Sequence, residues 1–415
     1  MSSHEDTLFT AIDHCRICGC SDLADVFSLG NIALSGRFPA PGEQDAPRGP
    51  LDMISCEECG LLQLRHNFNS DALYLHDYGY RSGLNEMMRG HLADLAADTA
   101  ARVNLAAGDI VLDIGSNDAT LLKSYAVSGL RRWGMDPTID QFAEFYTQDI
   151  NAIAALFDAD VFLQNAGGKA KAITSIAMFY DLADPNGFVD GIAHSLAPEG
   201  IWTLEQSYLP TMIEQNAFDT ICHEHLEYYG LRQIDILIRK HDLKIIDVSL
   251  NEVNGGSFRV HVAHQDASFA VSSHVAARLA QEKAEGYHSL EPVHVFQARV
   301  GDLRRELIDV LENIQLQGKS VFVYGASTKG NTLMQYCGID NSMVTAAADR
   351  NPEKWGKRTP GTNIPIISEV TARSQQPDYF LVLPWHFKEA FLKREAEFLN
   401  GHGKMIFPLP EVTIV

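Results

Sequence analysis

The clearest pattern of hydrophobic and polar positions lies at residues 111–122, where the chain reads VLDIGSNDATLL. The apolar run around Asp113 predicts a buried strand, Gly115 predicts a tight bend, and residues 120–122 begin a helical pattern. Such a bend lets the backbone approach a ligand closely, and the following helix N-terminus offers unpaired N–H groups. The stretch therefore predicts a strand, a glycine turn and a helix at a ligand-binding edge.

A second predicted strand follows at residues 130–135 and also ends in an acidic residue, Asp136, which precedes Pro137. Asp136 lies 23 residues after Asp113. At this spacing a carboxylate in a nucleotide-binding fold can accept hydrogen bonds from both ribose hydroxyls. Asp136 and Pro137 are therefore predicted to contact the nucleoside of a cofactor.

Two cofactors use this layout, and the glycine pattern helps to separate them. A dinucleotide fold carries G-x-G-x-x-G, so that pyrophosphate binds at the helix N-terminus. Here Gly115 is followed by Ser116, Asn117 and Asp118, which place a carboxylate where pyrophosphate would lie. This favours S-adenosylmethionine, a cationic nucleoside without phosphate, whose amine Asp113 can hold. The alternative is a structural turn in an ordinary α/β domain.

Further strands and helices alternate beyond this motif. Residues 172–181 predict a buried strand with Tyr180 and Asp181 at its polar end, which is where ligands bind in open α/β sheets. The other predictions are a helix at 87–103, a helix at 188–196, a turn at 198–200 and a strand at 201–206. This alternation predicts a mostly parallel, doubly wound sheet.

A second nucleotide-type pattern lies near the C-terminus, after a long helical stretch at residues 276–316. A strand at 319–324 enters Gly325 and Gly330, which have the spacing of the outer glycines of G-x-G-x-x-G, and Asp349 ends the next strand. Three interpretations stay open for this degenerate motif: a redox dinucleotide site, structural packing, or a site in which Lys329 and backbone N–H groups hold a sugar-nucleotide diphosphate. A later strand is predicted at 379–383.

Composition narrows the class of protein. The 415 residues suggest about three domains, and a hydrophobic content of 46% lets each bury a core. The net charge of −21 argues against a nucleic-acid or membrane-surface role. We expect a cytoplasmic protein, because no apolar run reaches about 18 residues and residues 1–10 lack a leader pattern. Its seven cysteines are then metal ligands or buried thiols rather than disulfides.

Two C-x-x-C-G knuckles, separated by 37 residues, predict a metal site. Their cysteines are Cys15, Cys18, Cys56 and Cys59. Four thiolates form a closed tetrahedral zinc site with no open position, so a structural zinc is expected. Cys20 is spare. Farther along, Tyr78 and Tyr80 lie in a linker, where they either pack at a domain junction or form a lid over the cofactor.

The densest cluster of titratable groups is CHEHLEYY at residues 222–229. A second metal is one interpretation, but His223 and His225 are two residues apart and no H-E-x-x-H pattern occurs. A structural cluster is another, because buried histidines often bond carboxylates. The third is acid–base chemistry, since a histidine beside a carboxylate can have its pKa held near neutrality.

Taken together, the motifs resemble the sugar C-methyltransferase family. The resemblance rests on the cysteine knuckles, DIGSND at 113–118, CHEHLEYY at 222–229, NGGSFR at 254–259 and YGASTKGNTL at 324–333, which occur in one order over essentially the whole chain. It implies an S-adenosylmethionine-dependent enzyme that adds a branch methyl to a nucleotide-linked 4-keto deoxysugar, as in tetronitrose and mycarose pathways. It also implies three domains: a zinc-binding domain (1–72), a class I methyltransferase domain with a doubly wound sheet (73–265) and a Rossmann-like domain (266–415).

The resemblance also implies roles for individual residues. His225 matches the general base that would form an enolate, with Glu224 as its acidic neighbour. For such a mechanism we ourselves expect Tyr78, Tyr80 or His223 to donate a hydrogen bond to the enolate oxygen. The expected substrate contacts are Tyr180, Asp181, Cys222, Asn254, Lys329 and Asn331. Two positions depart from the family pattern, which has a tyrosine at Cys222 and a histidine in the loop that here reads Phe179-Tyr180-Asp181.

These departures put the substrate and the site of methylation in question. The alternatives are therefore methylation of oxygen or of a non-sugar, an NAD-linked oxidoreductase using residues 325–330, and a zinc-ribbon scaffold. The expected partner is the nucleotide-linked sugar, without nucleic acid or membrane, and the protein is expected to be a monomer or small homo-oligomer.

Overall fold

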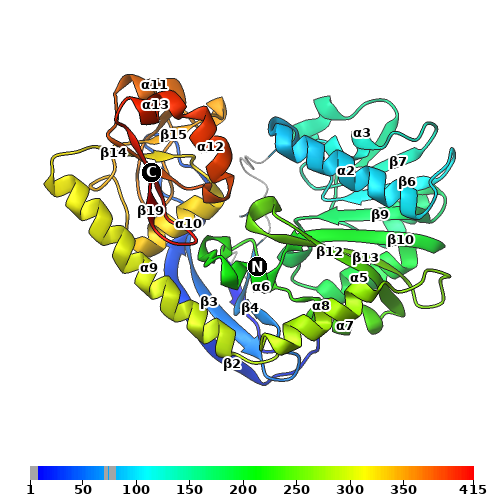
Figure 1. The fold of residues 1–415 in the computed structure, drawn as a ribbon. Coiled ribbons are helices and arrows are strands. Elements are labelled where there is room, and N and C mark those ends of the chain that lie inside the picture. Colours follow the sequence, from blue (N-terminus) through cyan, green and yellow to red (C-terminus); the bar gives the residue numbers. More distant parts are fainter. Residues whose placement is uncertain (1–7, 70–72, 74–80) are drawn as a thin grey trace, which may run out of the picture.

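The computed structural model describes residues 8–69, 73 and 81–415, so the predictions for Tyr78 and Tyr80 lie outside the described residues. Figure 1 shows two sheet-and-helix lobes that stand side by side above a long N-terminal β-ribbon, with α9 (Glu291–Leu316) running along one flank. Within the described part of the chain, no helix is both long and apolar enough to cross a membrane.

The central lobe contains a seven-stranded sheet in the order β12-β13-β10-β9-β6-β7-β8. Five neighbouring strands run parallel, and β13 pairs antiparallel with both β10 and β12 at one edge. The strands are β6 (Ile110–Ile114), β7 (Arg131–Met135), β8 (Ile150–Ile153), β9 (Ala170–Ile176), β10 (Leu196–Ser207), β12 (Leu243–Asn251) and β13 (Ser257–His264). The predicted doubly wound sheet is therefore confirmed, with an antiparallel edge that the sequence did not reveal.

The helices of this lobe are α2 (Glu86–Arg102), α3 (Thr120–Ser124), α4 (Ala159–Ala166), α5 (Pro185–Ser195), α7 (Leu231–Arg239) and α8 (Ser273–Ala284). Every residue of β6 is buried, as its continuous apolar run predicts for a central parallel strand. The predicted strand 172–181 ends early, because β9 stops at Ile176 and residues 179–181 form a short 3₁₀ turn. The predicted turn at 198–200 is a register shift within β10.

The N-terminal segment forms a sheet in the order β11-β4-β3-β2. Its strands are β2 (Leu23–Ala33), β3 (Arg48–Cys56), β4 (Leu62–Leu64) and β11 (Glu227–Tyr228), while β1 (Phe9–Ala11) pairs separately with β5 (His66–Phe68). β11 belongs to the histidine-rich segment far along the chain, yet it pairs with β4. That segment therefore joins the N-terminal sheet to the central lobe.

The second lobe has a six-stranded sheet in the order β16-β15-β14-β17-β18-β19, parallel except for β19. The strands are β14 (Val321–Tyr324), β15 (Ala347–Asp349), β16 (Ile366–Ser368), β17 (Tyr379–Val382), β18 (Lys404–Phe407) and β19 (Thr413–Ile414). Its helices are α10 (Thr328–Cys337), α11 (Glu369–Ser374), α12 (Lys388–Arg394) and α13 (Ala396–Asn400). The order of the parallel strands is that of a Rossmann-like fold.

The stretch predicted to be helical at 276–316 consists of two helices rather than one. The structure divides it into α8 and α9, because Gly286 adopts φ +83° and Pro292 occupies the first turn of the second helix. α8 packs against β12 and α7 in the central lobe, whereas α9 packs against α10, β2 and α6 (Leu209–Glu214). The break therefore lies where the chain leaves the central lobe.

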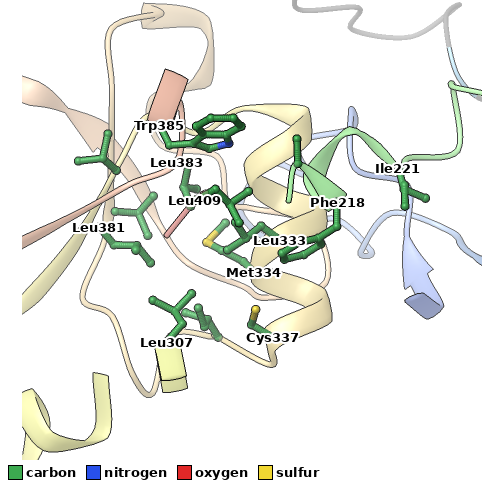
Figure 2. Packing of buried hydrophobic residues seen from close by; sticks show 14 of the residues in the cluster. Phe218, Ile221, Leu307, Leu333, Met334, Cys337, Leu381, Leu383, Trp385 and Leu409 are labelled. Carbon is green, nitrogen blue, oxygen red and sulfur yellow. The ribbon is translucent and has the colours of Figure 1, made fainter. Parts of the chain in front are cut away.

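One hydrophobic core continues from the second lobe into the other two parts of the molecule. Figure 2 shows Phe218, which precedes the histidine-rich segment, against Leu333 and Met334 of α10. On the N-terminal side, Asn331 Nδ2 donates to the Ser35 carbonyl oxygen at 2.7 Å. Asn331 is thus fully buried in an interface between domains and does not line the cavity described below.

Candidate active site

A cavity of about 400 Å³ opens at the carboxyl ends of the central parallel strands. It is bounded by α2 on one side, by Phe68 of the N-terminal segment, and by Glu224 of the histidine-rich segment. Of the predicted site residues, those that line it are Asp113, Gly115, Ser116, Asn117, Asp136, Pro137, Asp181, Glu224 and Asn254. Residues predicted separately for cofactor and substrate therefore meet in one space.

Gly115 lets the backbone pass close to the cavity wall. It adopts φ +74°, and a Cβ added there would lie 3.0 Å from Cγ of Met178. The loop that follows is held by Tyr146, whose hydroxyl lies 2.7 Å from Ser116 Oγ and donates to the Asn117 carbonyl oxygen at 3.0 Å. The turn is therefore preformed and leaves open the space that a side chain would fill.

Two carboxylates form the polar wall of this part of the cavity. Asp113 Oδ1 accepts a hydrogen bond from Thr174 Oγ1 at 2.6 Å, and burial raises the pKa of Asp113 to about 7. Asp136 accepts from the backbone N–H groups of Asn117 and Thr138 at 2.9 and 2.6 Å. A cationic cofactor would restore the charged form of Asp113, and the described residues that line the cavity include no basic side chain to hold a pyrophosphate, so these residues fit S-adenosylmethionine.

Asp118 was predicted near the cofactor, but the structure places its carboxylate outside the cavity. Its carboxylate accepts from Thr120 Oγ1 at 2.6 Å and from the Gly83 N–H at 3.0 Å, and it does not line the cavity. The neighbouring Asn117 accepts from the Ser82 N–H at 3.0 Å. Asp118 therefore fixes the turn before α2 against the cofactor loop, which is an indirect role.

Several cavity residues were missed from the sequence. Leu156 and Phe157 follow β8 and supply an apolar wall, and Glu205 and Gln206 lie at the end of β10. The sequence contained a signal for them, since each pair lies at or beyond the carboxyl end of a strand, where ligands bind in such sheets. Glu205 is already paired, because Arg259 Nε donates to it at 2.8 Å and His91 lies in contact with its other oxygen.

Glu224 is the titratable member of the histidine-rich segment that lines the cavity, next to Leu226 of the same segment. No hydrogen bond to its carboxylate occurs among the described residues, and burial raises its pKa to about 7. Its Oε1 would lie 2.5 Å from a Cβ added to Gly36, so the N-terminal segment closes over it. A desolvated carboxyl with a pKa near neutrality is suited to proton abstraction.

His225 does not line this cavity. Its Nδ1 donates to the Thr220 carbonyl oxygen at 2.6 Å, its ring centroid is 4.3 Å from that of Tyr180, and both residues line a second cavity of about 10 Å³. Burial and the nearby Lys329 lower the pKa of His225 to about 3, so the ring is neutral at physiological pH. Its Nε2 is then an acceptor, though a weakly basic one.

His223 points away from the cavity. Its Nε2 donates to the Gly49 carbonyl oxygen at 3.1 Å, and its ring packs edge-on against Phe68 with centroids 4.7 Å apart. Burial lowers the pKa of His223 to about 4. The structure therefore separates two histidines that sequence patterning alone could not distinguish.

Cys222 completes the cluster, since ligand atoms of Cys222, Glu224 and His225 all lie within 4.8 Å of one another. The cluster includes His225 but not His223, so the His223–His225 pair considered for a second metal does not come together. The ammonium of Lys329 interacts with both Cys222 and His225. Because a positive charge already lies beside the cluster, a second cation there would be repelled.

Lys329 projects from the start of α10 toward the central lobe. Its Nζ donates to the carbonyl oxygen of Asn254, a cavity residue, at 2.9 Å. Burial lowers the pKa of Lys329, while Asp219 and Cys222 oppose that change. That Lys329 contacts a diphosphate stays a prediction, and Lys329 is not among the residues that line the cavity.

The glycines of the C-terminal motif serve packing between β14 and β17. A Cβ on Gly325 would lie 2.7 Å from Pro384, and one on Gly330 would lie 2.6 Å from Leu383. Asp349 accepts from the Ala326 N–H at 2.8 Å, so this loop is bonded to the acid that a dinucleotide ribose would need. These contacts favour the structural interpretation of the motif.

The four predicted zinc ligands converge. Cys15 and Cys59 have Sγ atoms 3.5 Å apart, Cys18 and Cys56 have Sγ atoms 3.3 Å apart, and all four sulfurs lie within 4.8 Å of one another. Four thiolates at such spacing match the donor set of a closed tetrahedral zinc site. Cys20 lies outside this group of four sulfurs, and its Sγ accepts from the Asp22 N–H.

The knuckles are tied to the central lobe by their backbone. Lys240 Nζ donates to the Ile17 carbonyl oxygen at 2.6 Å, and Gln233 Nε2 donates to that of Cys59 at 3.1 Å. Between the first two cysteines, buried Arg16 donates to the Leu64 carbonyl oxygen at 2.7 Å and lies 3.4 Å from Glu227 of β11. The metal site thus supports the segment that carries Glu224.

Three family descriptions match successive parts of the chain: a zinc binding domain over residues 15–74, a methyltransferase domain over 84–248 and a C-methyltransferase C-terminal domain over 252–410. The C-methyltransferase NovU of Streptomyces niveus is 33% identical over 410 residues, which cover 97% of this chain and 97% of that protein.

Solved structures resemble part of the chain. An O-methyltransferase family protein from Burkholderia thailandensis is 14% identical and covers 48% of this chain and 64% of its own, with a TM-score of 0.37. The 1,6-didemethyltoxoflavin-N1-methyltransferase of the same species, with bound 1,6-didemethyltoxoflavin and S-adenosylhomocysteine, is 12% identical and covers 43% and 80%, with a TM-score of 0.33.

Proposed function

The chain belongs to the C-methyltransferase family and is an S-adenosylmethionine-dependent enzyme with a zinc-binding domain; from this premise we propose that its substrate is a nucleotide-linked keto-deoxysugar. The proposed acceptor carbon is C-3 of a 4-keto sugar. S-adenosylmethionine supplies a methyl group on a positively charged sulfur. The chain must therefore make the acceptor carbon nucleophilic and hold it near that methyl group.

The observation that carries this proposal is the position of Glu224. Its carboxylate has no hydrogen-bond partner among the described residues and shares a cavity with Asp113 and Asp136. A carbon next to a ketone is acidic enough for such a base to remove its proton, whereas transfer to a hydroxyl makes no use of an enolate. The proton passes to Glu224, and the C–H electron pair moves toward the keto oxygen.

The geometry favours Glu224 over His225 as the group that takes the proton. Glu224 lines the cavity and has a pKa of about 7, whereas His225 does not line it and has a pKa of about 3. The family resemblance had suggested the reverse assignment. We propose that His225, fixed by Thr220, orients Glu224 and keeps its surroundings neutral.

Two alternatives from the sequence remain useful comparisons. Methylation on oxygen or on a non-sugar is compatible with the departures at Cys222 and Asp181, and it needs no strong base next to a ketone. An NAD-linked oxidoreductase would need a ligand at Gly325 and Gly330, but both glycines contact Pro384 and Leu383 closely. The packing of that loop therefore argues against the second alternative.

The product of the reaction tests the proposal. The enzyme is incubated with S-adenosylmethionine labelled with ¹³C at the methyl group and a panel of nucleotide 4-keto sugars, and the product is analysed by NMR. A methyl carbon bonded to carbon at C-3 is expected. A methyl bonded to oxygen would reject the enolate chemistry, and a product at another ring carbon would reject C-3 alone.

A further inference from the structure

One polar side chain of the cavity wall lacks partners within the protein. Gln206, near the end of β10, lines the cavity and is 1% exposed. Neither its Nε2 nor its Oε1 has a hydrogen-bond partner in the described part of the chain. Burying an amide without partners costs free energy, and native proteins seldom leave such groups unsatisfied. The cost is explained if a ligand supplies the two partners.

Other polar side chains of the cavity are bonded within the protein. Ser116 Oγ lies 2.7 Å from the Tyr146 hydroxyl, and Ser257 Oγ donates to the Val253 carbonyl oxygen at 2.9 Å. These hydroxyls fix loops at the cavity wall. The amide of Gln206, in contrast, keeps both a donor and an acceptor for a bound molecule.

The pleat of β10 directs Gln206 to the side of the sheet that carries the histidine-rich segment. Glu205 contacts a side chain of α2, so the next residue, Gln206, points to the opposite face together with Trp202. On that face Trp202 packs against Phe179, which packs against Tyr229, both pairs with ring centroids 5.4 Å apart. Tyr229 ends the histidine-rich segment, so the segment that carries the proposed base packs on the same face as Gln206.

The order of the strands separates Gln206 from the predicted nucleoside contacts. β9 lies between β10 and β6, whereas β7 and β8 lie on the other side of β6. Asp136 follows β7, and Leu156 and Phe157 follow β8. Because neighbouring strands are about 4.8 Å apart, β10 lies about 10 Å from β6 and farther from β7. Gln206 is therefore placed to contact the acceptor rather than the nucleoside.

We propose that Gln206 is a substrate-binding residue whose amide holds the acceptor by two hydrogen bonds. Nε2 donates to one oxygen of the acceptor, and Oε1 accepts from a hydroxyl on the adjacent carbon. Because the two ends of an amide lie close together in one plane, the acceptor must carry its two oxygens on neighbouring carbons, as an α-hydroxy ketone does. The inference rests on the proposed function and narrows its substrate class to keto sugars with a hydroxyl next to the ketone.

The test compares Gln206→Met with Gln233→Met, because methionine keeps the length of the side chain and removes the amide. Gln233 is the matched control, since it is also buried in the central lobe but is bonded at both ends. Its Nε2 donates to the Cys59 carbonyl oxygen at 3.1 Å, and its Oε1 accepts from the Gly230 N–H at 3.2 Å. The Tm, the S-adenosylhomocysteine affinity, and kcat/KM with a nucleotide 4-keto sugar and with its analogue lacking the neighbouring hydroxyl are measured.

We expect Gln206→Met to unfold at the same temperature as wild type or a higher one, since it removes a buried amide without partners. Gln233→Met should unfold at a lower temperature, because it leaves its partners unsatisfied. In Gln206→Met the dissociation constant of S-adenosylhomocysteine should be unchanged, and kcat/KM for the hydroxylated sugar should fall about tenfold or more. The preference of the wild type for this sugar over the analogue should disappear in the same variant.

Three results would each overturn the inference: a loss of Tm in Gln206→Met as large as in Gln233→Met, weakened S-adenosylhomocysteine binding, or an unchanged preference for the hydroxylated sugar. The first would show that the amide is structural, and the second that it belongs to the cofactor site. Absence of methylation of every keto sugar by the wild-type enzyme would instead refute the proposed function, and the inference would fall with it.

Discussion

At the scale of single residues, the site combines one glycine in the left-handed conformation with carboxyls that burial keeps partly protonated. Gly115 occupies a conformation and a space that an L-residue would not tolerate, next to Met178. Asp113 and Glu224, at different parts of the same cavity, both have pKa values raised to about 7 by burial. Asp113 is suited to a bound cation and Glu224 to proton abstraction, so burial supports two different roles.

The glycine gives a direct prediction. Gly115→Ala should weaken S-adenosylhomocysteine binding about tenfold or more, because the added methyl group meets Met178 at 3.0 Å and φ +74° is strained for alanine. Calorimetry measures the dissociation constant. Gly167→Ala is the matched control, since Gly167 has φ +64° but nothing within 4 Å of an added Cβ. Equal affinities for both variants would contradict the placement of the cofactor against Gly115.

At the scale of elements, β11 is the connection that organises the site. It follows Glu224 directly and pairs with β4, whose neighbouring strand β3 ends at Cys56. The Leu64 N–H also donates to the Leu226 carbonyl oxygen at 2.8 Å. One small sheet thus connects the zinc site, through Cys56 at the end of β3, to the proposed base, which precedes β11 in the sequence.

Removing zinc should therefore disturb more than the N-terminal domain. We expect one zinc per chain, and Cys56→Ser should lose it and increase hydrogen–deuterium exchange at residues 226–228, because β11 then loses its supported partner strand. Elemental analysis and exchange mass spectrometry measure the two effects. Cys20→Ser is the control, since Cys20 lies beside the knuckle but outside the set of ligands. Unchanged exchange at 226–228 in a zinc-free variant would contradict this connection.

At the scale of the whole molecule, three parts of the chain surround one cavity, and this is where sequence reasoning reached its limit. The local patterns around Gly115 and the four cysteines were sufficient to predict the strand–turn–helix motif and the cluster of sulfurs, because each pattern lies within short segments. The pairing of β11 with β4 joins residues more than 160 positions apart, and no local pattern specifies it. The directions of His223 and His225 depend on that pairing, which is why the sequence could not separate them.

The buried carboxyls predict how stability depends on pH. The pKa of Glu224 is about 7 in the folded protein and near 4.5 in the unfolded chain, so the folded state retains a proton that the unfolded state releases between these values. Rising pH through this window therefore destabilises the wild type relative to Glu224→Gln, by on the order of 3 kcal/mol at most. Denaturant unfolding from pH 4.5 to 8 measures the difference, and a constant difference would contradict the raised pKa.

The most direct test of the account is deuterium exchange at the acceptor carbon, measured by NMR in D₂O with S-adenosylhomocysteine bound so that methyl transfer cannot follow. Wild-type enzyme and His223→Asn should exchange the proton, and Glu224→Gln should lose about 10²–10⁴-fold, the usual contribution of a general base. The exchange rate should fall less in His225→Asn, because His225 acts through Glu224. Full exchange in Glu224→Gln together with its loss in His225→Asn would contradict the assignment and return the base to His225.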